Sequence, residues 1–143
     1  MNITHVVVHC SDSPAGRGDT AATIHSWHKE KGWDGIGYHH VILEDGTVQN
    51  GRPHYWHGAH VKGYNHCSIG ICLIGKPNME GTIDAYPEEQ ITALRRTIRQ
   101  IDSVDVYSER AGAKVLGHRD LDSSKTCPGF DVSEWWAGVK DQY

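Results

Sequence analysis

Long hydrophobic runs are missing from this sequence of 143 residues. The longest one, IGICLIG near residue 70, is far shorter than the roughly 18–20 apolar residues that a membrane-spanning helix needs. The mean hydropathy of −0.54 is that of an ordinary globular chain. We therefore expect no membrane insertion. The length of the chain is suited to one domain, since two domains would each be too small for a sizeable core.

A basic excess and a dense set of cysteines are missing too. Lys and Arg number 14 against 18 Asp and Glu, and the basic residues are scattered, so nucleic acid is not an expected partner. Four cysteines are too few for a disulfide scaffold. Cys10, Cys67 and Cys72 are expected to be buried and reduced, whereas Cys127 lies among polar residues. Histidine, at 11 residues, is the one real excess.

The first ten residues, MNITHVVVHC, lack the positively charged start and the small-residue cleavage site of a signal peptide. Their β-branched run is typical of a strand. We therefore expect synthesis in the cytoplasm, followed by a release step if the substrate lies outside the membrane.

Strand and helix patterns alternate along the chain and predict an α/β fold. The expected strands, one pair of them a hairpin turning at Asp45-Gly46, lie within residues 3–9, 38–52, 68–75 and 114–118. The expected helices lie at 20–32, 86–105 and 131–139. The hairpin makes the sheet mixed, so we predict a single domain, residues 1–143, with a central mixed β-sheet flanked by helices.

Two histidines stand at the carboxyl ends of predicted buried strands, His9 after the first and His118 after the last. Ligand crevices of open α/β sheets lie at these ends, so the fold can bring the two residues together. Cys127 follows nine residues beyond His118, and catalytic zinc takes three such ligands with water in the fourth position. His9, His118 and Cys127 therefore form a candidate zinc site.

Other ligands remain open at this point. Asp120 and Asp122 could compete for the metal or hydrogen-bond the far nitrogen of a ligand histidine. The neighbours His39 and His40 point to opposite faces of a strand, so they cannot bind one ion together, and one is expected to face the crevice. The remaining candidates occupy a helix and a loop, where core, surface or substrate-contact roles are expected: His25, His28, His54, His57 and His60.

Four motifs together resemble a known family: VHCSDS, IHSWHKEKGWDGIGYHHVILEDGTVQNGR, GAHVKGYNHCSIGICLIG and GHRDLDSSKTCPGFDVSEWW. They are similar to the zinc-dependent N-acetylmuramoyl-L-alanine amidases, a family shared by phage lysozymes and animal peptidoglycan-recognition proteins. The resemblance covers nearly the whole chain. It implies a central mixed sheet with flanking helices, in agreement with the fold predicted above.

The resemblance also implies roles for individual residues. The family's zinc ligands fall on His9, His118 and Cys127. Its catalytic tyrosine and lysine correspond to Tyr38 and Lys125, and positions lining its substrate groove correspond to His60 and Asn65.

The implied activity is zinc-dependent hydrolysis of the amide between N-acetylmuramic acid and L-alanine in bacterial peptidoglycan, by a monomer that acts on the cell wall after release. Two departures stand out. The strand expected to carry His9 begins almost at Met1, so we expect no counterpart of the arm of polymerase-inhibiting phage lysozymes. The loop from His118 to Cys127 is expected to be one residue longer than in such a lysozyme.

Three rival functions remain: a module that binds peptidoglycan without cutting it, a zinc peptidase that cleaves within the stem peptide, and a regulatory protein–protein role. Binding-only members of the family lack the cysteine ligand, so Cys127 favours catalysis.

Overall fold

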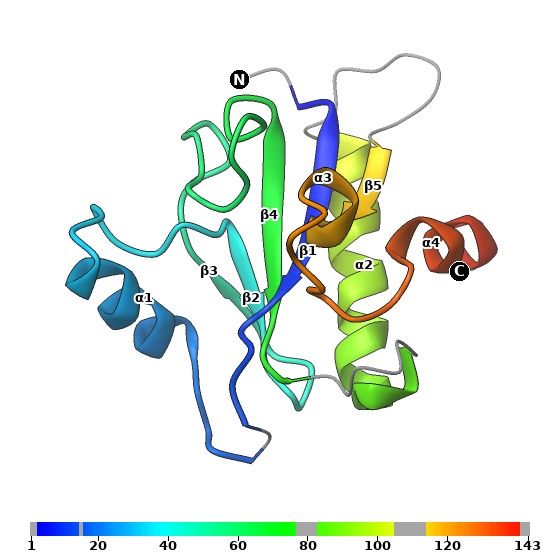
Figure 1. The fold of residues 1–143 in the computed structure, drawn as a ribbon. Coiled ribbons are helices and arrows are strands. Elements are labelled where there is room, and N and C mark those ends of the chain that lie inside the picture. Colours follow the sequence, from blue (N-terminus) through cyan, green and yellow to red (C-terminus); the bar gives the residue numbers. More distant parts are fainter. Residues whose placement is uncertain (1–2, 15, 77–82, 105–113, 141–143) are drawn as a thin grey trace.

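The computed structural model describes residues 3–14, 16–76, 83–104 and 114–140 (Figure 1). The strands within them are β1 (His5–Cys10), β2 (His40–Ile42), β3 (Val48–Asn50), β4 (Ser68–Leu73) and β5 (Lys114–Gly117). The helices are α1 (Ala21–Glu30), the short 3-10 helix η1 (Ile83–Ala85), α2 (Glu88–Val104), α3 (His118–Leu121) and α4 (Val132–Val139). This order follows the predicted alternation, with η1 and α3 as additions. Asp105, the predicted end of the second helix, lies outside the described residues.

The strands form one sheet in the order β3-β2-β4-β1-β5. β1, β2, β4 and β5 are parallel, and only the hairpin strand β3 runs against its neighbour β2. The turn between β2 and β3 contains Gly46, whose φ of +91° is a conformation that glycine adopts without strain. The predicted mixed sheet of a single domain is thereby confirmed.

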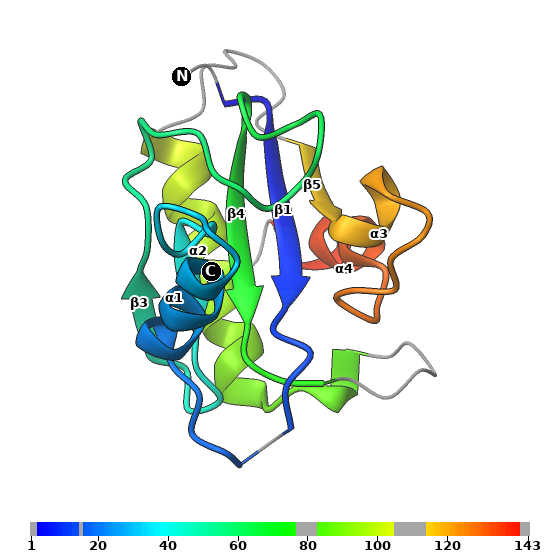
Figure 2. The same cartoon turned by 60° about the vertical axis from the view of Figure 1, so that its left-hand side comes forward.

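Helices cover both faces of the sheet, with α1 on one side and α2 on the other (Figures 1 and 2). On the α2 side, alternate β1 residues Val6 and Val8 join a large apolar core that includes Leu94 and Ile98 of the helix. The helix expected at 86–105 is thus confirmed, and its apolar residues at helical spacing, among them Ile101, face this core. Burial of such stripes is the main stabilising term for the fold.

The α1 side of the sheet is different, because its apolar cluster is small and centres on Ile24 of the helix. Since side chains alternate along a strand, His9 points to this side while its neighbours Val8 and Cys10 point to α2. Within the described residues, no helix is both long enough and apolar enough to cross a membrane.

The four cysteines, all within the described residues, are free. Cys10 and Cys72 are buried as predicted, whereas Cys67 is only half-buried.

Candidate functional site

His9 and His118 meet because their parallel strands end at the same edge of the sheet. The register of β1 and β5 puts Val8 opposite Gly117, so the next residue of each chain segment is a histidine. The Nδ1 atoms of the two rings are 3.1 Å apart. His9 is fully buried within β1, and His118 is half-buried as the first residue of α3 rather than the last of a strand.

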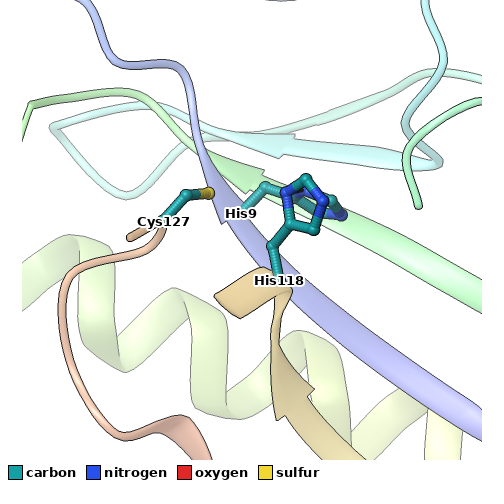
Figure 3. Close-up of side chains that lie close together, drawn as sticks. All are labelled: His9, His118 and Cys127. Atoms are coloured by element: carbon teal, nitrogen blue, oxygen red, sulfur yellow. Dashed lines mark hydrogen bonds between the residues drawn. The ribbon is translucent and has the colours of Figure 1, made fainter. Parts of the chain in front are cut away.

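The loop after α3 brings Cys127 back to these histidines. The N–H of Arg119 donates to the Cys127 carbonyl at 2.9 Å, and the N–H of Cys10 donates to Cys127 Sγ at 2.9 Å. One nitrogen of each ring and the sulfur all lie within 4.8 Å of one another (Figure 3). This His-His-Cys group could hold a metal ion, and no other comparable group occurs in the described part of the chain.

The donor atoms of the group suit zinc. Two nitrogens of a tetrahedral zinc site, each about 2.0–2.1 Å from the ion, are about 3.3–3.4 Å apart, close to the 3.1 Å between the two Nδ1 atoms. Burial, with added repulsion from His60 and His118, lowers the pKa of His9 well below its usual value. Burial lowers the pKa of His118 too, so both rings offer lone pairs at neutral pH.

The sulfur of Cys127 is a thiol until a cation replaces its proton. Its contact with the Cys10 thiol, reinforced by burial, raises the pKa of Cys127. Metal ligation requires the thiolate, so binding must release this proton. The backbone N–H of Cys10 already points at the sulfur and would stabilise the negative charge.

Tyr38 approaches the group from a loop that α1 holds in place. The N–H of Gly37 donates to His28 Nδ1 at 2.9 Å, and a side chain at Gly37 would collide with the Ala59 carbonyl, 2.2 Å from the site of its Cβ. The Tyr38 ring centroid lies 5.0 Å from that of His9. Burial raises the pKa of Tyr38 well above its usual value, so its hydroxyl remains protonated and can donate.

A cleft of about 840 Å³ opens over the group, and its lining includes His9, Tyr38, His118 and Cys127. Lys125 lies exposed on the loop beside Cys127 and lines the same cleft. The structure thus brings five of the seven predicted site residues to one cavity.

The cleft also has charged residues that the sequence analysis missed. Lys31, Lys76 and Arg119 add positive charge to its lining, and Asp12 is the acidic member. Asp12 follows β1 and Lys76 follows β4, so the rule that crevices form beyond the carboxyl ends of strands could have identified both. Lys31 caps the carboxyl end of α1 and had no comparable signal.

His60 and Asn65, predicted to contact substrate, lie outside this lining. His60 is 9% exposed, and its Nδ1 lies 2.8 Å from His9 Nε2. Burial lowers the pKa of His60 to about 3. Asn65 Oδ1 accepts the N–H groups of His60 and Val61, both at 2.9 Å. Substrate binding by either residue stays a prediction, and their contacts favour a supporting role.

The competing carboxylates have other partners. Asp120 Oδ2 accepts the N–H of Gly117 at 2.9 Å, at the start of α3. Asp122 Oδ1 accepts both the N–H and the hydroxyl of Ser124, at 3.0 and 2.6 Å. Neither carboxylate joins the His-His-Cys group.

The adjacent strand histidines also lie away from the cleft, so the expectation that one of them faces it is wrong. His39 is fully buried, its Nδ1 accepting the N–H of Gly70 at 3.0 Å. His40 lines a separate hollow of about 730 Å³ between the hairpin and α2. His40 faces the α2 side of the sheet, away from the cleft, and the His39 ring is enclosed between the N–H of Gly70 and the carbonyl of Trp56.

Known proteins give an independent view of the chain. A family described as N-acetylmuramoyl-L-alanine amidase matches residues 1–130. The endolysin of Klebsiella phage KP32 is 39% identical over 134 residues, which are 93% of this chain and 85% of that protein.

Solved structures agree with this match. The amidase LysCS of Clostridium intestinale has a TM-score of 0.78 at 29% identity, over 96% of this chain and 84% of that one. A Drosophila PGRP-LB mutant in complex with tracheal cytotoxin has the same TM-score at 28% identity, over 96% of this chain and 82% of that one.

The family match over most of the sequence, the similarity to an endolysin and the shared fold confirm the resemblance seen in the motifs. The chain belongs to the N-acetylmuramoyl-L-alanine amidase family and has the peptidoglycan amide-hydrolysing activity of that family.

Proposed function

We propose that this amidase works with one Zn²⁺ held by His9, His118 and Cys127, and that it cuts the bond between N-acetylmuramic acid and L-alanine. The observation that supports the metal is the convergence of two imidazole nitrogens and one sulfur within 4.8 Å at the floor of a cleft. Three protein ligands beside an open cavity are the arrangement of catalytic rather than structural zinc.

Zinc bound at this place would polarise the amide carbonyl and lower the pKa of a bound water to about 7. Lys125 then acts as a fixed cation beside the carbonyl oxygen, where negative charge develops in the tetrahedral transition state. Tyr38, a protonated phenol beside His9, orients the attacking water or donates to the same developing charge. The basic lining of the cleft suits a substrate with carboxylates, as peptide stems of peptidoglycan have.

Zinc and cleavage are tested together on purified peptidoglycan. A chelator should abolish the release of fragments, and added zinc should restore it, with elemental analysis giving about one zinc per chain. Mass spectrometry should find free alanine amino termini and uncut glycan strands, whereas a peptidase acting within the stem would leave other termini. Full activity in chelator, with no bound metal, would rule out the proposed metal site.

The variant Cys127→Ser tests whether the sulfur of Cys127 is a zinc ligand. This variant should lose zinc and activity together, because a hydroxyl is a far poorer zinc ligand than a thiolate. Cys67→Ser is the matched control, since Cys67 is also half-buried and lies outside the cleft lining. Cys67→Ser should retain both zinc and activity. Unchanged zinc content in Cys127→Ser would show that the sulfur is not a ligand.

We further propose that the enzyme is a monomer. We also propose that it acts on the cell wall after release from the cytoplasm, in keeping with the name endolysin of its relatives.

A further inference from the structure

A chain of buried hydrogen bonds runs from the back of the His-His-Cys group into the protein. His9 Nε2 lies 2.8 Å from His60 Nδ1, and His60 Nε2 lies 3.1 Å from Ser68 Oγ. The Ser68 hydroxyl is in turn 2.7 Å from the Tyr64 carbonyl oxygen. All three side chains are buried. Of the three, only His9 is a proposed zinc ligand, so His60 and Ser68 need another explanation.

The directions of these hydrogen bonds follow from the last acceptor. A carbonyl oxygen cannot donate, so the Ser68 hydroxyl must donate its single proton to Tyr64. Ser68 Oγ must then accept from His60, which places the proton of His60 on Nε2.

The same reasoning fixes the tautomer of His9. The partners of His60 are a hydroxyl and an imidazole rather than a carboxylate, so its buried ring is neutral, with one N–H. Its Nδ1 therefore accepts, and His9 Nε2 must be the donor. This leaves a lone pair on His9 Nδ1, the atom that faces His118 at 3.1 Å.

The packing around His60 holds its ring in this orientation. A Cβ at Gly70 would lie 2.6 Å from His60 Cγ, and one at Gly58 would lie 2.5 Å from His60 Cδ2, so both glycines leave room that the ring fills. The side-chain oxygen of Asn65 accepts the backbone N–H of His60 itself. Backbone and ring are thus both fixed before any ligand arrives.

We propose that His60, oriented by Ser68, is a positioning residue that holds His9 as the tautomer with Nδ1 free to bind the metal. This inference rests on the proposed zinc site and explains how the metal-free protein keeps the ligand atom of His9 ready. Partners of this kind typically contribute about 10–100-fold to metal affinity. His60 therefore acts through His9 and does not need to touch the substrate.

Zinc affinity, measured by competition with a chromogenic chelator, tests the proposal without relying on turnover. His60→Phe keeps a ring but removes the acceptor, and should weaken zinc binding by about 10–100-fold. His60→Asn places an oxygen near the former Nδ1 and should recover most of the affinity. Ser68→Ala should cause a smaller loss in the same direction.

The matched control is His28→Phe. His28 is similarly buried at 7% exposure and also accepts a hydrogen bond through Nδ1, but its donor is the backbone N–H of Gly37 and not a member of the His-His-Cys group. This variant should lose stability and keep wild-type zinc affinity. Equal affinities in His60→Phe and the wild type would overturn the proposal.

Nitrogen NMR of histidine-labelled, metal-free protein reads the tautomers directly. His9 and His60 should both carry their proton on Nε2, and Ser68→Ala should weaken that preference in His60. A proton on His60 Nδ1 in the wild type would contradict the hydrogen-bond directions, even if His60→Phe fails to fold. If the wild-type protein binds no zinc, the proposed function is wrong. The tautomers measured by NMR would still show whether the hydrogen bonds among His9, His60 and Ser68 have the inferred directions.

Discussion

Burial divides the side chains at the cleft into two kinds. His9 is enclosed and Tyr38 largely so, and burial moves the pKa of each in the direction that keeps it uncharged. Lys125 lies exposed on a loop instead, where water stabilises its charge. The enclosed residues can therefore supply lone pairs and a phenolic hydrogen, and the exposed lysine supplies charge.

Replacing Lys125 should separate catalysis from metal binding. Lys125→Ala should keep its zinc and lose about 10²–10³ in kcat, the usual cost of removing one stabilising donor at a developing oxyanion. Steady-state kinetics and elemental analysis of the same preparation check both parts. Lys62→Ala is the control, because Lys62 is exposed and outside the cleft lining, and it should behave as the wild type. A wild-type kcat in Lys125→Ala would remove the lysine from the mechanism.

Individual residues differ in how far the sequence could predict their roles. His9 and His118 were predictable because each lies at the carboxyl end of a strand-like run, and such ends meet at one edge of a parallel sheet, as those of β1 and β5 do. The contact between His60 and His9 was not predictable, since it depends on space left by Gly58 and Gly70 on segments distant from His9. Burial and tautomer are properties of packing, and spacing along a chain carries little information on either.

Helix α2 is joined to the sheet by a polar contact as well as by apolar packing. Gln90, fully buried in the first turn of α2, donates through Nε2 to the carbonyls of Ile42 and Ile74, both at 2.9 Å. These carbonyls lie at the ends of β2 and β4, so one amide joins the helix to two strands. The apolar stripe of α2 was predictable from helical spacing, but a glutamine on the same face looked like an ordinary polar residue.

Gln90→Leu should therefore destabilise the fold although it increases hydrophobicity. The Ile74 carbonyl loses its donor, whereas the Ile42 carbonyl keeps the N–H of Ile74 at 3.0 Å, so the free energy of unfolding should fall by about 1–3 kcal/mol. Urea denaturation followed by circular dichroism measures the change. Glu88→Ala, an exposed substitution in the same turn, should stay within about 0.5 kcal/mol of the wild type. An unchanged midpoint in Gln90→Leu would mean that the contact adds nothing to stability.

The whole molecule is asymmetric about its sheet. The α2 side is filled by aliphatic and aromatic side chains. The α1 side has a small apolar cluster, and its burial of His28 and His39 lowers the pKa of each to about 4. Buried imidazoles stay neutral at neutral pH and so keep the lone pairs that a metal site needs. Because they resist protonation in the folded state, the stability of the fold depends on pH.

Stability should accordingly fall on acidification well before the carboxylates titrate. Histidines of the unfolded chain take up protons below about pH 6.5, whereas His28 and His39 in the folded state do so only near pH 4. The unfolded state then binds more protons, so the free energy of unfolding decreases from about pH 6.5 down to about pH 4, and His60, with a pKa of about 3 in the folded state, extends the decrease below that. Thermal melts in chelator, which removes any contribution from metal, should show the melting temperature falling across this window. His39→Phe should flatten the profile, and His57→Gln, at an exposed position, should leave it unchanged. A melting temperature that stays constant from pH 7 to pH 4.5 would contradict the assignment of these buried rings as neutral.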